Sequence, residues 1–151
     1  MNKKSLVVLA IDSAWRDLRG ALESATASEL DKPGVYGQWS LKTLLGHIAS
    51  WDERVCGLLL GSKPWCNDDR DRLNLNDARK TSVLSSGQVL RDLEERHRTL
   101  REAMRTANDS LFERDSPIRE IIDCNTIYHY LEHGAQIKAW LRTNSPAAPT
   151  Y

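Results

Sequence analysis

Cysteine is scarce in this sequence, and its spacing argues against a disulfide-stapled fold. The three cysteines, Cys56, Cys66 and Cys124, are odd in number and form no CxxC pair. A disulfide framework needs an even set of paired cysteines, which is typical of oxidising compartments. We therefore expect free thiols and a reducing, cytoplasmic location.

Long apolar runs and a charge excess are also missing. The apolar run near the start, LVVLAI (6–11), has six residues before Asp12, too short for the core of a signal peptide. No segment approaches the roughly 20 apolar residues of a membrane span. Lys+Arg and Asp+Glu both number 21, and nucleic-acid binding would show as a basic excess or stripe. We expect no membrane or nucleic-acid partner.

What the chain does contain is helical periodicity, with no convincing alternation of strand type. Its hydrophobic and charged shares, 40% and 28%, are ordinary for a globular protein. The chain length favours one domain over residues 1–151, with a real core. The predicted fold class is all-α.

Start and stop signals divide the chain into four long helices. Ser40 is a good N-cap, Ser85 and Gln88 fit a capping box, and Ser116 with Pro117 is a strong start signal. The DKPG stretch (31–34) ends the first helix. The predicted helices cover about residues 3–26, 40–61, 85–107 and 116–141.

The long polar connection 61–84 indicates how these helices are arranged. A short helix capped by Asn76 is expected within it. The second long helix spans roughly 30 Å, and the connection is long enough to return along that whole length. Helices two and three are therefore predicted to run parallel, in a four-helix bundle of up-down-down-up order.

The last helix carries too many polar groups for an ordinary buried face. In YHYLEHGAQIKAW (128–140), His129 and His133 are four residues apart and share one stripe. On a helical wheel the inward arc is defined by apolar residues that include Ala135 and Ala139, and it also takes in Asn125, Glu132 and Gln136. A buried polar group without a partner costs about 1–3 kcal/mol, so this concentration predicts a function.

A third histidine completes a candidate metal site. His47 lies at the edge of the apolar arc of helix two, and with the i, i+4 pair it makes three imidazoles that leave coordination positions open. Each feature has a plainer interpretation: an HxxxH pair alone is a weak signal, and His47 alone fits a core-edge histidine. For His97 a structural role is favoured. Trp51 and Trp140 are expected to be core or pocket walls.

These motifs resemble those of a known superfamily. WSLKTLLGHIASWDE (39–53) and IYHYLEHGAQIKAWL (127–141) look like the second-helix and last-helix motifs of the DinB-like four-helix-bundle superfamily. The middle, LNLNDARKTSVLSSGQVLRDLEERHRTLREAM, is similar to the branch with ClbS/DfsB-type proteins and the mycothiol-dependent maleylpyruvate isomerase. The resemblance covers about residues 5–142. It implies metal ligands at His47, His129 and His133, a divalent metal, and frequent homodimers, but no single activity.

Three functional hypotheses follow from these observations. The first is an enzyme, a metal-dependent thiol S-transferase or hydrolase that acts on a small electrophile with zinc or nickel and a low-molecular-weight thiol. Its expected substrate pocket consists of Trp51, Asn125, Glu132, Gln136 and Trp140. The second is a protein that sequesters a reactive small molecule without turnover. The third is a structural bundle whose histidines satisfy one another.

Overall fold

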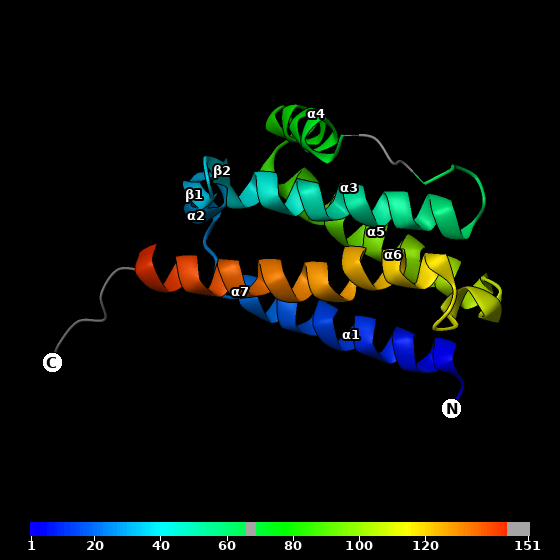
Figure 1. Ribbon diagram of the computed structural model, residues 1–151. Helices are drawn as coiled ribbons and strands as arrows, with labels where there is room; N and C mark the ends of the chain where they lie inside the picture. The colour runs from blue at the N-terminus through cyan, green and yellow to red at the C-terminus, as the bar shows by residue number, and fades with distance from the viewer. Residues whose placement is uncertain (66–68, 145–151) are drawn as a thin grey trace, which may run out of the picture.

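Helices dominate the computed structural model, which describes residues 1–65 and 69–144 (Figure 1). The elements in chain order are α1 (Lys3–Leu22), α2 (Ala27–Asp31), β1 (Pro33–Tyr36), β2 (Trp39–Ser40), α3 (Leu41–Leu59), α4 (Arg70–Ser82), α5 (Ser86–Thr106), η1 (Asp109–Phe112), α6 (Pro117–Asn125) and α7 (Ile127–Asn144). The predicted all-α helical bundle is confirmed. None of the described helices combines the length and apolarity needed to cross a membrane.

Three of the helix starts lie where side-chain caps predict them. Ser40 accepts a hydrogen bond from the Thr43 backbone N–H at the start of α3. Ser85 and Gln88 form the reciprocal capping box of α5. Ser116 precedes α6, which has a proline in its first turn. Such caps contribute about 1 kcal/mol each, because they satisfy backbone donors that the helix itself leaves unpaired.

The long helices pack as two layers, α1 beside α7 and α3 beside α5 (Figure 1). Lys42 Nζ donates to the Leu84 carbonyl at one end of the α3–α5 pair, and Cys56 Sγ to the Thr99 carbonyl further along. Both partners advance in the same chain direction, so α3 and α5 run parallel. Ile11, Leu44, Leu100 and Ile137 are fully buried between the layers. Burial of each such side chain contributes about 1.5–3 kcal/mol.

The first helix is shorter than predicted, and a small hairpin follows it. α1 ends at Leu22, because Thr26 caps a separate short helix, α2, with a capping box of its own. β1 and β2 then pair antiparallel through a turn in which Gly37 has a positive φ of 56°. Strands of four and two residues are too short to show an alternating pattern, so periodicity missed them.

The helix inside the long connection starts earlier than predicted. Its N-cap is Asp69, whose Oδ1 accepts from the backbone N–H groups of Asp71 and Arg72, and Asn76 lies inside the helix. The charged run DDRDR (68–72) is typical of a solvated loop, so its Asp69 was not recognised as a helix cap from sequence. α4 lies across the outer face of α3, over the half of α3 nearer to β2 (Figure 1), and its Thr81 contacts Gly46 of α3.

The last helix is broken, which corrects the prediction of one helix over 116–141. Thr126 separates α6 from α7 with φ −127° and ψ −78°, and its hydroxyl donates to the Ile122 carbonyl. The buried residues of α7 are His129, Tyr130, His133, Gly134, Ile137, Trp140 and Leu141. Ala135 and Ala139, expected to face inward, are exposed.

Candidate metal centre

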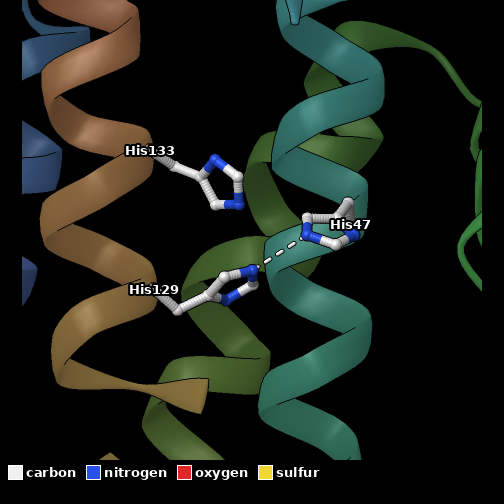
Figure 2. Close-up of side chains that lie close together, drawn as sticks. All are labelled: His47, His129 and His133. Atoms are coloured by element: carbon white, nitrogen blue, oxygen red, sulfur yellow. Dashed lines mark hydrogen bonds between the residues drawn. The ribbon is translucent and has the colours of Figure 1, made fainter. Parts of the chain in front are cut away.

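Helices α3 and α7 bring three histidines together in the interior (Figure 2). His47 comes from α3, and His129 and His133 come from successive turns of α7. Their ring centroids are 4.5–5.2 Å apart, and one nitrogen of each lies within 4.8 Å of the others. Each residue is only 5–6% exposed. The geometry therefore gathers the three predicted ligands at one buried point.

The hydrogen bonds of these rings show which nitrogens are free to bind an ion. His47 Nε2 and His129 Nε2 are 2.8 Å apart, so one ring donates its proton and the other accepts. His133 donates from Nδ1 to the Gln136 side-chain oxygen at 2.7 Å. That bond leaves the lone pair of His133 on Nε2, which faces the other two rings in Figure 2.

The surroundings keep all three rings in the neutral form. Burial, reinforced by the electrostatic effect of the neighbouring His133 ring, lowers the pKa of His47 to about 3. Burial and the neighbouring histidines hold the pKa of His129 well below its ordinary value. Burial also lowers the pKa of His133, against the opposing hydrogen bond to Gln136. Neutral imidazole is the form that ligates metals, so the rings need no deprotonation at neutral pH.

The residues present fit a divalent ion. Buried Nδ1 atoms of His47 and His129 have no hydrogen-bond partner among the described residues, so the protein leaves these rings unsatisfied. A tetrahedral zinc with bonds of 2.0–2.1 Å separates its ligand nitrogens by about 3.3 Å. The His47–His129 pair, at 2.8 Å, is about half an ångström too close for that. The three nitrogens lie within 4.8 Å of one another, so around an ion the His47–His129 pair would open slightly and the wider separations would narrow.

Aromatic side chains surround the cluster. Tyr36 and Trp39, on the β1–β2 hairpin, have ring centroids 6.0 Å from His133 and 5.2 Å from His47 respectively. Trp51, predicted as a wall, is fully buried 6.5 Å from His47. The hairpin that periodicity missed thus supplies part of the enclosure.

Of the other predicted pocket residues, Asn125 and Gln136 make contacts in the interior, whereas Glu132 and Trp140 lie elsewhere. Asn125 is buried and donates to the Ile121 carbonyl at 2.8 Å, and Gln136 contacts His133 directly. Glu132 is exposed on α7 and therefore does not lie on the buried face. Trp140 is buried, but its indole nitrogen lies against Gly34 of the hairpin.

A buried polar network next to the cluster was not anticipated from the sequence. The Tyr130 hydroxyl donates to Asp52 Oδ1 at 2.7 Å and accepts from His97 Nδ1 at 3.0 Å. Trp15 stacks flat on His97 with 3.8 Å between ring centroids. His97 is thus held by packing and hydrogen bonding, as a structural residue would be, and it lies outside the three-histidine cluster. Asp52 lies four residues after Ile48 on the apolar stripe of α3, a signal that was available in the sequence.

The Asp52 carboxyl group in this network binds its proton more tightly than an ordinary aspartate does. Asp52 is fully buried, and burial raises its pKa to about 8, against the opposing hydrogen bond from Tyr130. Burial lowers the pKa of His97 to about 3, so this ring is neutral. The network consequently holds a proton on or near Asp52 at neutral pH.

Fold and site together define the class: an all-α bundle with a buried three-histidine cluster between two of its helices. A sequence model of the DinB superfamily matches residues 10–137, and the chain belongs to this superfamily. The match contains all three histidines. No match was found among curated proteins or among solved structures. The finer assignment to the ClbS/DfsB or mycothiol-dependent isomerase branch stays a prediction.

Proposed function

We propose that this protein is a divalent-metal-dependent, thiol-linked transferase or detoxifying enzyme that acts on a small electrophile. The convergence of His47, His129 and His133 as neutral, buried imidazoles carries the proposal. Three protein ligands leave at least one coordination position for a water or substrate atom, as in catalytic rather than structural sites. The nitrogen donor set suits zinc or nickel.

The described cysteines support an external thiol. Cys56 is buried against α5, and burial raises the pKa of its thiol, which disfavours the reactive thiolate. Cys124 is exposed on α6, outside the three-histidine cluster. Cys66 lies outside the described residues. A low-molecular-weight thiol is therefore the proposed source of the nucleophilic sulfur.

A bound divalent ion lowers the pKa of a coordinated water or thiol and so supplies a nucleophile at neutral pH. Residues of the chain orient one ligand ring and limit the access of water to the cluster. Gln136 holds the proton on His133 Nδ1, which keeps Nε2 available as a ligand. Tyr36, Trp39 and Trp51 limit access of water to the rings.

Metal content and thiol turnover test the proposal. We expect one equivalent of zinc or nickel in the wild-type protein and none in His129→Ala, measured by elemental analysis. Metal-loaded protein should consume a cellular thiol with a model electrophile over many turnovers. The proposal fails if thiol loss is the same for metal-loaded, metal-free and His129→Ala protein. Capture of one equivalent of electrophile without turnover would instead support sequestration.

A further inference from the structure

Two arginines contact the same indole, and their surroundings differ. The guanidinium of Arg54 lies 4.5 Å from the Trp51 ring centre, and that of Arg70 lies 4.2 Å from it. Trp51 is fully buried beside His47, and its Nε1 donates to Asn74 Oδ1 at 2.9 Å. Stacking on an aromatic face orients a guanidinium while leaving its N–H donors free for other partners.

Arg54 is fully neutralised. Both of its terminal nitrogens donate to Asp77, at 2.8 and 2.9 Å, and Asp77 is only 5% exposed. This is the bidentate pairing that a guanidinium makes with a carboxylate. Arg54 therefore has a complete structural role in joining α3 to α4.

Arg70 has no such partner. Among residues 1–65 and 69–144 it pairs with no carboxylate, and its one hydrogen bond goes to the neutral side-chain oxygen of Asn125, at 3.3 Å. The preceding residue, Asp69, uses its carboxylate to cap α4. Arg70 is also the first residue of α4, where a positive charge opposes the helix dipole. Helix stability thus gives no reason for an arginine here.

The surroundings of Arg70 give a reason for an arginine at this position. Its contacts with Trp51 and Asn125 hold it between α3 and the end of α6, beside the three histidines. Its charge lies close enough to His47 and His129 to act on both rings. A divalent ion would add further positive charge. A site with this much uncompensated positive charge is complementary to an anion.

We propose that Arg70, oriented by Trp51 and Asn125, is a specificity-determining residue that binds a carboxylate of the small molecule acted on at the metal centre. This inference rests on the proposed function and adds the substrate class: a small thiol or electrophile that carries a carboxylate. The guanidinium fork matches the two carboxylate oxygens, with Arg54 and Asp77 as the same pairing within the protein.

Two thiols of similar size, one with a carboxylate, test this assignment. 3-Mercaptopropionate and 2-mercaptoethanol are titrated into zinc-loaded protein by calorimetry, for wild type, Arg70→Gln and the control Arg79→Gln. Arg79 is an exposed cation on the same helix, so its replacement removes the same charge elsewhere. We expect about tenfold tighter binding of the carboxylate thiol to wild type and Arg79→Gln, and loss of this preference in Arg70→Gln. Equal affinities in wild type, or the same loss in both variants, would overturn the inference.

The outcome is separable from that of the proposed function. If elemental analysis finds no bound metal, the proposed function fails, and propionate is titrated into the metal-free protein instead. The indole N–H resonance of Trp51 then reports binding by NMR. A shift that saturates in wild type and Arg79→Gln but is absent in Arg70→Gln supports the carboxylate site by itself. No saturable shift in wild type rejects it.

Discussion

The hydrogen bond between His133 and Gln136 decides which nitrogen of one ring faces the cluster. Gln136 accepts the Nδ1 proton at 2.7 Å, and without it the ring is free to change tautomer or rotate. We predict that Gln136→Leu weakens zinc binding about 10- to 100-fold, as is usual for loss of an outer partner of a metal-binding histidine. Competition with a chromophoric chelator measures this affinity.

Glu132→Gln is the matched control for this prediction. Glu132 lies on the same helix, one residue before His133, but it is exposed. Its replacement removes a charge near the site without touching the Gln136 bond, so zinc affinity should change by less than about threefold. Equal losses in the two variants would mean that general electrostatics, rather than the tautomer of His133, controls affinity.

At the scale of elements, one glycine sets how closely α4 approaches α3. A Cβ built at Gly46 would lie 2.2 Å from Thr81 Oγ1 and 2.9 Å from Thr81 Cβ. Rotation of the threonine cannot relieve the second contact, so α4 would have to shift. We predict that Gly46→Ala destabilises the protein by about 1–3 kcal/mol, measured by urea unfolding. Because α4 carries Arg70, the carboxylate preference should fall as well.

Gly20→Ala provides the comparison. Gly20 is also inside a helix, α1, but a Cβ there meets no atom within 4 Å among the described residues. Alanine should stabilise this helix by about 0.5–1 kcal/mol, since glycine is the poorer helix former. If both variants stabilise the protein, the close contact between α3 and α4 does not limit the packing.

Helix starts were predictable where a cap stands just before an apolar pattern, as at Ser40, Ser85 and Ser116. The signal is local, so no knowledge of packing is needed. Thr126 carries no comparable stop signal, since threonine is tolerated within helices. Its break depends on how α6 and α7 fit the other helices. Glu132 was placed on the wrong face for a separate reason: a wheel that takes Ala135 and Ala139 as inward turns the predicted arc toward Glu132, whereas both alanines are exposed.

For the molecule as a whole, buried titratable groups predict the pH dependence of stability. The lowered pKa values of His47 and His97, about 3, mean that the unfolded chain binds more protons below about pH 6.5. Stability of the metal-free protein should rise with pH from about 3 to 6.5. Asp52, raised from 3.8 to about 8, acts in the opposite direction, because the folded state holds the extra proton. Stability should therefore fall from about pH 6.5 to 8.

Asp52→Asn isolates the alkaline part of this profile. Asparagine still offers an oxygen to Tyr130 but does not titrate, so the decline between about pH 6.5 and 8 should disappear. Urea unfolding of metal-free wild type and variant at several pH values measures the difference. An unchanged decline in the variant would show that Asp52 is not the group responsible.

The three-histidine cluster was predictable from sequence, and its neighbours were not. His129 and His133 stand out because an i, i+4 histidine pair is a spacing that one helix imposes. In the sequence Arg70 is indistinguishable from an ordinary surface arginine, and only the structure shows its contacts with Trp51 and Asn125. Its role depends on contacts between elements distant in the chain, which helical periodicity cannot reveal.

The contact of Tyr130 with Asp52 and His97 fixes how far α7 is shifted along its axis relative to α3 and α5. Apolar side chains tolerate a helix that slides, but a slip of one turn, about 5.4 Å, would break both hydrogen bonds of the Tyr130 hydroxyl. His129 is the preceding residue, so the same contact sets its depth. The spacing of the imidazoles is thus kept by the protein rather than by an ion. We therefore expect the bundle to stay folded whether or not an ion is bound at the cluster.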